Sequence, residues 1–177
     1  KPEGWRDQLN GAAGVISCVG AFGSNEYMEK VCGDATVEMV KAAAEAKVPR
    51  FVFISAHDYG PAFKAILRGY VEGKYKAEAA IKEYFPDSGV YLRPGFVHGT
   101  RQISASASIP LGLIGGPLEK ILRGDSVQKL AMQQPLLGPF LVPPTSVEDV
   151  ASAAVNAATD LSVPAGPMDV WTIPKYA

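Results

Sequence analysis

The sequence has few of the residues that hold metals or form disulfides. Among 177 residues there are two cysteines, Cys18 and Cys32, and two histidines, His57 and His98. They form no C-x-x-C pair and no spacing typical of zinc ligands, so we expect no metal site. Both cysteines lie in apolar runs, which favours two buried thiols and is compatible with a reducing compartment.

The chain also lacks an excess of charge of either sign. It has 17 lysines and arginines against 18 aspartates and glutamates, a net charge of -1. Because the basic residues form no dense runs, the sequence argues against a nucleic-acid binder, whereas one or two placed cations could still hold an acidic substrate. No signal peptide is visible, and the first residues run straight into a strand-like segment, so we expect the chain to begin in mid-fold.

What is present is an ordinary globular composition, with 47% apolar residues and length enough for one domain with a core. Short apolar runs rich in β-branched and aromatic residues predict buried strands. These strands are expected at Gly14–Gly20, Arg50–Ser55, Gly89–Gly95 and Met168–Ile173. Apolar residues at helical spacing predict helices at 26–47 and 69–84, and Ser146 with Asp149 forms a capping box that opens a third helix.

This alternation predicts an α/β fold, the C-terminal part of a Rossmann-like parallel sheet with helices on both faces. We expect a partial Rossmann-like core at 1–100 and a returning helix and last strand of that core at 146–177. Between them, 101–145 is expected to be an irregular apolar region for a substrate or partner, with one short helix near Leu118–Arg123. Ligands of such sheets bind beyond the carboxyl ends of the strands.

A glycine-rich G-x-G-x-x-G turn between a first strand and helix, the usual pyrophosphate site of nucleotide-binding sheets, is not found. The nearest glycine cluster, Gly112–Gly116, follows no predicted strand. Without a preceding strand, Val15–Val19 would be an exposed apolar sheet edge, which proteins avoid. We therefore expect that an N-terminal βαβ half is missing from this chain or that a partner covers the edge.

Four segments in order, "VISCVGAFGSN", "RFVFISAHDYG", "YVEGK" and "LRPGFVHGTR", carry a family resemblance. The chain resembles the second half of an extended or atypical short-chain dehydrogenase/reductase. It is most similar to plant and algal chloroplast NAD(P)-binding Rossmann proteins associated with plastoglobules. More distant relatives are a ubiquinone-synthesis accessory protein and an accessory subunit of respiratory complex I. The resemblance implies NAD or NADP as cofactor, with NADPH favoured. It also implies an organellar location, with the chloroplast (plastoglobule or thylakoid) favoured and the mitochondrial inner membrane as the alternative.

The resemblance also implies a catalytic trio of Ser55, Tyr70 and Lys74. The further positions that it implies for the cofactor are Gly20, Ala21 and Phe22 on the adenosine and ribose side, Lys74 at the ribose, and Pro94 and Gly95 beside the nicotinamide. Arg101 stands where a substrate or cofactor contact is expected.

The chemistry of the trio follows from its residue types. A tyrosine titrates near pH 10 unaided, so proton exchange at neutral pH calls for a nearby cation. Tyr70 and Lys74 are four residues apart and share one helix face, so we expect Lys74 to lower the pKa of Tyr70 and to bind the ribose hydroxyls. Ser55 is expected to hydrogen-bond the reacting oxygen. The alternatives are a solvated helix face for Tyr70 and Lys74 and a polar turn residue for His57.

Two uncharged stretches, 103–118 and 130–147, are interrupted by proline, glycine and serine and do not predict a membrane span. They are compatible with a substrate-domain core, with an apolar substrate pocket, or with a surface for a membrane or partner. Two functions follow. The first is an NAD(P)-dependent oxidoreductase acting on an apolar carbonyl or on a quinone or isoprenoid compound. The second is a non-catalytic Rossmann accessory subunit or scaffold of an organelle membrane complex, such as a respiratory complex I or a quinone-synthesis assembly.

Overall fold

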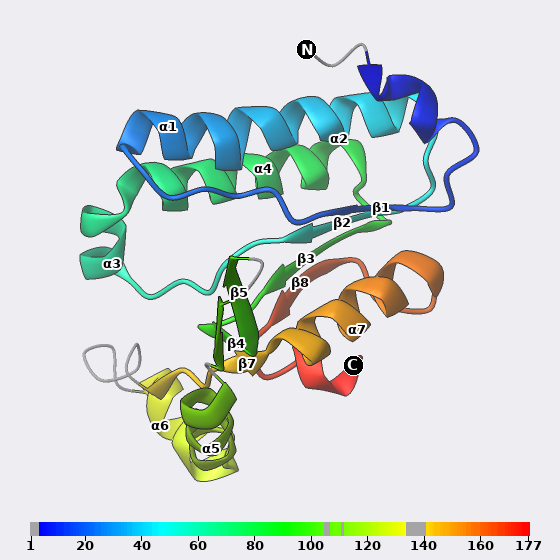
Figure 1. Ribbon diagram of the computed structural model, residues 1–177. Coiled ribbons are helices and arrows are strands. Elements are labelled where there is room, and N and C mark those ends of the chain that lie inside the picture. Colours follow the sequence, from blue (N-terminus) through cyan, green and yellow to red (C-terminus); the bar gives the residue numbers. More distant parts are fainter. Residues whose placement is uncertain (1–3, 105–106, 111, 134–140) are drawn as a thin grey trace.

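The centre of the molecule is a parallel sheet, seen in a computed structural model that describes residues 4–104, 107–110, 112–133 and 141–177. Its strand order is β1-β2-β3-β8, with every neighbouring pair parallel. The strands are β1 (Val15–Ser17), β2 (Phe51–Ile54), β3 (Gly89–Arg93) and β8 (Gly166–Asp169). Helices cover both faces of the sheet (Figure 1), so the predicted Rossmann-like α/β class is confirmed.

One face carries two long helical segments. The first is continuous from α1 (Asn25–Glu29) through a π-helical turn (Lys30–Asp34) to α2 (Ala35–Glu45). It begins at Ser24, whose hydroxyl accepts a hydrogen bond from the backbone N–H of Tyr27. The second is α4 (Arg68–Tyr84), which follows the short α3 (Pro61–Ile66). Side chains of these helices pack with β2 in a buried cluster that includes Val40, Ala43, Phe51, Phe53, Ala77, Ile81 and Phe85.

The opposite face is covered by α7 (Val147–Thr159). The Ser146 hydroxyl accepts a 3.0 Å bond from the backbone N–H of Asp149, which confirms the predicted N-cap. A second core cluster joins α7 to the sheet and includes Val52, Val90, Leu92, Ala153, Ala154, Ala157 and Ile173. Arg50 is buried beneath this helix and donates to the carbonyl oxygens of Ala157 at 2.6 Å and Val163 at 2.5 Å.

Glycines let α4 approach its neighbouring helix closely. A Cβ atom on Gly73 would lie 3.0 Å from the backbone nitrogen of Gly33 in the π-helical turn. A Cβ atom on Gly69 would lie 1.9 Å from the carbonyl oxygen of Asn25, whose side chain accepts the Gly69 N–H. The glycine within "YVEGK" is therefore explained by helix packing.

The region between β3 and α7 differs from its prediction. It contains β4 (Val97–His98), which pairs in parallel with β7 (Thr145–Ser146), and an antiparallel pair of β5 (Thr100–Ser104) with β6 (Ala107–Pro110). Two helices follow β6, namely α5 (Gly112–Leu122) and α6 (Asp125–Gln133). The expectation of irregular chain was wrong, whereas the short helix expected near Leu118–Arg123 overlaps the second half of α5.

The reason is tertiary contact. Glu119 on α5 contacts His98 on β4 at 2.5 Å, and both residues are buried. Glu119 also pairs with Arg123, whose guanidinium lies 3.7 Å from the Asp149 carboxylate at the start of α7. These contacts hold a helix that contains Pro117 and several glycines, residues that by themselves predict a break.

The end of the chain also departs from expectation. The last strand spans Gly166–Asp169 and ends where Met168–Ile173 was predicted to continue. Asp169 ends it, because its carboxylate accepts the backbone N–H groups of Trp171 and Thr172 at 3.1 and 2.8 Å and so forms a turn. A short 3-10 helix, Ile173–Lys175, follows, and another, Arg6–Leu9, lies near the start of the chain.

Candidate functional site at the carboxyl ends of the strands

Lys74 bridges the ends of β1 and β2. Its Nζ atom donates to the carbonyl oxygen of Ile54 at 2.7 Å and to that of Val19 at 3.2 Å. The ammonium also lies over the ring of Phe53, 4.4 Å from the ring centroid, and the residue is 5% exposed. Burial lowers the pKa of Lys74 to about 8, because the charged form is poorly solvated.

Gly20 follows β1 beside this ammonium. A Cβ atom at this position would lie 3.5 Å from the Lys74 Nζ, so the small residue leaves the lysine approachable. The next residue, Ala21, accepts a hydrogen bond from the Cys32 thiol at 3.6 Å. Gly20, Ala21 and Lys74, three of the predicted cofactor residues, therefore share one corner of the site.

Tyr70 lies one turn before Lys74 on α4. Its ring stacks on the exposed ring of Phe22, with centroids 5.1 Å apart and planes 12° apart. The Lys74 ammonium lies 5.7 Å from the centroid of the Tyr70 ring. The structure therefore brings together Tyr70, Lys74 and Phe22.

The expected lowering of the Tyr70 pKa is wrong for this arrangement. Burial raises the pKa of Tyr70 to about 12, with smaller contributions from Cys32 and Tyr59. Lys74 does not offset the burial, because its ammonium is directed to two main-chain carbonyls at the strand ends. Tyr70 is therefore a protonated phenol at neutral pH, which can donate a hydrogen bond or a proton.

The Ser55 hydroxyl does not point toward Tyr70 and Lys74 but is bonded to a carboxylate on α4. It donates to the Oε1 atom of Glu78 at 2.5 Å, and both residues are buried. The Glu78 carboxylate also accepts two bonds from Arg93, at 3.0 Å from Nε and 2.5 Å from Nη2. Glu78 was not among the site residues expected from the sequence. Its position could have indicated it, because Glu78 follows Lys74 by four residues on the same helix face.

A small pocket of about 10 Å³, room for about one oxygen atom of a ligand, contains Tyr70 and Lys74 together with the turn that follows β2. Its lining comprises Ala56, His57, Asp58, Tyr59, Tyr70, Val71, Lys74 and Tyr75. The Asp58 carboxylate accepts a 2.7 Å bond from the Tyr75 hydroxyl, a second contact of this turn with α4. Among the residues that the structure describes, Ser55 is not part of this lining.

His57 is fixed at the other side of this pocket. Its backbone N–H donates to the carbonyl oxygen of Pro94 at 2.9 Å. Its ring packs edge-on against Tyr59 and Trp171, with centroid distances of 5.2 and 5.8 Å. Gly95, the other residue predicted beside the nicotinamide, is tightly packed, because a Cβ atom there would lie 2.5 Å from the Pro143 carbonyl oxygen. The side chain of Arg101 lies outside the described residues.

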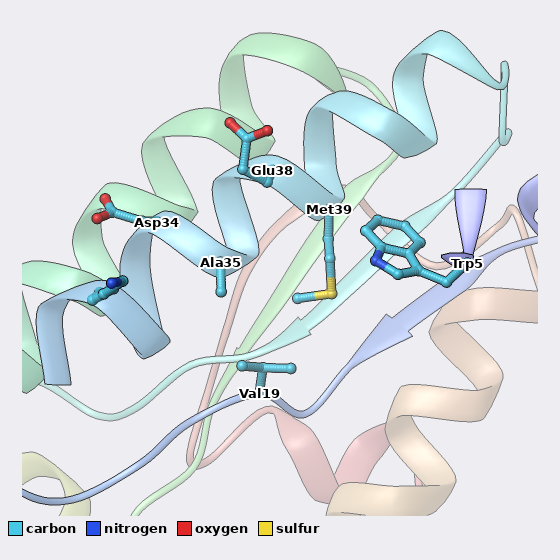
Figure 2. Close-up of a pocket in the computed structure, with 7 residues that line it drawn as sticks. Trp5, Val19, Asp34, Ala35, Glu38 and Met39 are labelled. Atoms are coloured by element: carbon cyan, nitrogen blue, oxygen red, sulfur yellow. The ribbon is translucent and has the colours of Figure 1, made fainter. Parts of the chain in front are cut away.

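A larger groove of about 620 Å³ lies beside β1, at the edge of the sheet. Figure 2 shows Met39 extending from α2 toward Trp5 and Val19. Ala35 completes the apolar wall, and the charged residues Lys30, Asp34 and Glu38 complete the lining. Among its described lining residues, this groove has no hydroxyl and no imidazole, whereas the smaller pocket has Tyr70, His57 and Lys74.

Metal clusters and membrane-spanning helices are both absent from the described ranges. Within them, no cluster of three or more His, Cys, Asp or Glu side chains is arranged to hold a metal ion. None of the described helices combines the length and the hydropathy needed to cross a membrane.

Comparison with known proteins decides the family. A family model described as NAD(P)H-binding matches residues 1–106, which include β1 to β3, α4 and the candidate site. The chain belongs to this NAD(P)H-binding family. The family resemblance predicted from the sequence is thereby confirmed, and the parallel sheet is consistent with it.

Relatives of this NAD(P)H-binding protein occur in plants and fungi. An uncharacterized chloroplastic protein of Arabidopsis thaliana is 40% identical over 88% of the chain. Mitochondrial fmp52 proteins are 31% identical over 96% of the chain in Aspergillus fumigatus and 32% identical over 87% in Aspergillus niger. The matched part spans 53% of the Arabidopsis relative, and 70% and 60% of the two fungal ones.

The residues present fit one end of a nicotinamide dinucleotide. An ammonium has three N–H donors, and Lys74 gives two of them to Val19 and Ile54, so among the described contacts one is left for a ribose hydroxyl. Gly20 keeps the space beside that ammonium clear, and the exposed ring of Phe22 offers an apolar surface at the same corner.

Proposed function

We propose that the protein is an NAD(P)-dependent oxidoreductase that reduces an apolar carbonyl or a quinone or isoprenoid-type compound, with NADPH preferred to NADH. The observation that carries the proposal is the position of Tyr70 and Lys74. They lie on one face of α4, over the carboxyl ends of β1 and β2, in a chain of the NAD(P)H-binding family. That edge of a parallel sheet is where ligands bind.

Each residue has a role that follows from its surroundings. The bound nicotinamide would supply the hydride. Tyr70, protonated because burial raises its pKa to about 12, would donate the proton to the reacting oxygen. Lys74 would anchor the ribose with its remaining N–H, and Gly20, Ala21 and Phe22 would border that part of the cofactor. Pro94 and Gly95 would border the nicotinamide end, next to His57.

A second candidate, a non-catalytic accessory subunit or scaffold that binds nucleotide, is favoured by one observation. The polar groups of Lys74 and Ser55 are engaged with the protein itself, with main-chain carbonyls and with Glu78 respectively. A site whose polar groups stabilise the strand ends can hold a nucleotide without turning it over.

The experiment that separates the two candidates combines binding with turnover. NADPH binding is measured by fluorescence, and NADPH oxidation is followed with 1,4-naphthoquinone as the probe, against a protein-free control. For an enzyme, Tyr70→Phe should lower kcat by about 100-fold or more and leave NADPH affinity nearly unchanged. Tyr84→Phe, the same chemical change at the exposed end of α4, is the matched control.

The scaffold would be favoured if the wild type and Tyr70→Phe both bind NADPH, neither reduces naphthoquinone, and the organelle membrane complex still assembles. Absence of NADPH binding would refute both candidates.

We also propose an organellar location, supported by the chloroplastic and mitochondrial names of the relatives, with the chloroplast preferred because the Arabidopsis relative has the higher identity. Peripheral association with a membrane or protein complex is part of the proposal. Its support is α5, where Ile114, Leu118 and Ile121 are spaced to share one face and are exposed. Fractionation of plastids and mitochondria, with detection of the full-length protein, tests the compartment, and recovery in the soluble cytosol would contradict it.

A further inference from the structure

The geometry points to His57, in place of Ser55, as the side chain that hydrogen-bonds the reacting oxygen of the substrate next to Tyr70. This inference rests on the proposed oxidoreductase function and changes the assignment of one residue in it. The reacting group of the substrate is then a carbonyl or quinone oxygen. This oxygen accepts hydrogen bonds from two neutral donors, the phenol of Tyr70 and the imidazole of His57.

Ser55 has no proton left for a substrate. A serine hydroxyl carries one hydrogen, and Ser55 donates it to Glu78 at 2.5 Å. The Glu78 side chain also accepts two bonds from Arg93, so its oxygens are acceptors toward both neighbours. A carbonyl oxygen needs a donor, so Ser55 in this arrangement cannot serve it.

His57 follows Ser55 by two residues and faces the pocket that Ser55 does not line. It lines the small pocket together with Tyr70 and Lys74. Its main chain is held by the bond to Pro94, and its ring is held between Tyr59 and Trp171. Because the backbone and the ring of His57 are already held in place, the side chain loses little conformational entropy when a ligand binds.

Burial favours a neutral imidazole at His57, although two nearby carboxylates oppose it. The nearby groups are Asp58 in the same turn, Asp169 at the end of β8, Arg93 at the end of β3, and the phenol of Tyr59. Burial, the largest effect, lowers the pKa of His57 below its usual value of 6.5, so at pH 7 the ring carries one N–H donor and one bare nitrogen. A neutral donor can polarise a carbonyl without placing a charge in the pocket.

The proton balance of the reduction leaves His57 unchanged. With a carbonyl substrate, two electrons would reach the carbonyl carbon with the hydride, the C=O bond would become a C–O single bond, and the oxygen would take the phenolic proton of Tyr70. A quinone would likewise take up one hydride and one proton in total and become the hydroquinone. Tyr70 then regains a proton from solvent. His57 stabilises the negative charge that develops on the oxygen and keeps its own N–H throughout.

The test uses the full chain with NADPH and 1,4-naphthoquinone. His57→Phe removes the N–H and preserves a ring against Tyr59 and Trp171, and it should lower kcat by about 100-fold with NADPH affinity changed by less than about threefold. His57→Gln restores a neutral N–H donor and should recover about tenfold of that loss. Ser55→Ala should lower kcat much less than His57→Phe does, under conditions where it remains folded.

The outcomes distinguish this inference from the function on which it rests. If NADPH does not bind, or if Tyr70→Phe remains fully active, the proposed function fails and His57 loses its role with it. If Tyr70→Phe is inactive while His57→Phe is active and Ser55→Ala is inactive, only the assignment of His57 is overturned. If NADPH binds and no form turns over naphthoquinone, NMR of the His57 ring decides. A chemical-shift change on adding naphthoquinone to the NADPH-bound chain supports the contact, and an unmoved resonance refutes it.

Discussion

The hydroxyl of Ser55 and the carboxylate of Glu78 lie 2.5 Å apart, and this bond joins the end of β2 to the middle of α4. Arg93 adds the end of β3, through its two bonds to the same carboxylate. Three segments distant in sequence therefore meet at one buried anion, within one helical turn of Lys74. The arrangement positions the candidate site and also stabilises the fold.

Removal of this anion should destabilise the protein strongly. Glu78→Ala leaves Arg93 and Ser55 without their acceptor and should lower the free energy of unfolding by about 3–5 kcal/mol. Ser55→Ala loses one bond to a charged group, a cost of about 1.5–3 kcal/mol. Urea denaturation measures both changes. The control is Glu72→Ala on the same helix, which breaks only the exposed pair with Arg68 and should cost less than about 1 kcal/mol. Equal losses for Glu78→Ala and Glu72→Ala would contradict the buried network.

The buried charge of Lys74 predicts a rise in stability with pH. The folded pKa of about 8 lies below the ordinary value of 10.5, so between these values the unfolded chain binds more protons. The free energy of unfolding should then rise through this window, by about 2–3 kcal/mol between pH 7.5 and pH 10. Well below pH 8, Lys74 is protonated in both the folded and the unfolded state, so the full cost of burying its charge lowers the free energy of unfolding.

The measurement is urea denaturation of the wild type and of Lys74→Met over pH 7–10. Tyr70 and Tyr75, whose pKa values are raised to about 12, act in the opposite direction above about pH 10, because there the folded state binds more protons. Their effect is common to both proteins and cancels in the difference. A difference that stays flat with pH would show that Lys74 is solvated in the folded state.

The close contact of α4 with α1 predicts a large effect for one methyl group. Gly69→Ala would place a Cβ atom 1.9 Å from the Asn25 carbonyl oxygen, a backbone atom that cannot rotate away. We expect a loss of about 2–3 kcal/mol or more in the free energy of unfolding. Gly116→Ala in α5 is the matched control, because its added Cβ meets no atom within 4 Å among the described residues beyond its chain neighbours and its own helix backbone. It should change the free energy of unfolding by less than about 1 kcal/mol, because the gain in helix propensity is opposed by the clash of a Cβ atom with the ring of Pro117. Thermal melts of the two variants make the comparison.

Replacing Arg50 should lower the free energy of unfolding by an amount that depends on how many of its hydrogen bonds the new side chain retains. The Arg50 guanidinium bonds two carbonyl oxygens, of Ala157 at the end of α7 and of Val163 beyond it, in a buried position. Arg50→Met keeps the apolar stem and leaves both carbonyls without this donor, so we expect a loss of about 2–4 kcal/mol. Arg50→Lys retains one of the two bonds and should lose less, since a lysine lacks the planar fork. If Arg50→Met were as stable as the wild type, water would have to reach both carbonyls.

The sheet could be predicted from the sequence because its signals are local. Phe51 to Ile54 and Gly89 to Leu92 are short apolar runs, which suit strands covered on both faces. The N-cap at Ser146 was predictable for the same reason, since donor and acceptor are three residues apart. Only the second half of α5 was predicted, near Leu118–Arg123, because a support of the whole helix, the contact of Glu119 with His98, joins positions 21 residues apart.

The candidate site was only partly predictable. The spacing of Tyr70 and Lys74 places them on one helix face, as the structure confirms. The direction of the Lys74 ammonium could not be predicted, because its acceptors, Val19 and Ile54, become neighbours only when β1 pairs with β2. For the same reason Ser55 was assigned to the reacting oxygen, although its nearest acceptor is Glu78.

The spacing of α4 limits how this protein can change in length. Tyr70, Lys74 and Glu78 follow one another at intervals of four residues, and each faces a different partner near the strand ends. One residue inserted between Lys74 and Glu78 would rotate the rest of the helix by about 100°. It would separate the proton donor and the lysine from the anion that secures the sheet beneath them. Insertions and deletions can therefore be accommodated only outside this segment, and within it the protein can vary by substitution alone.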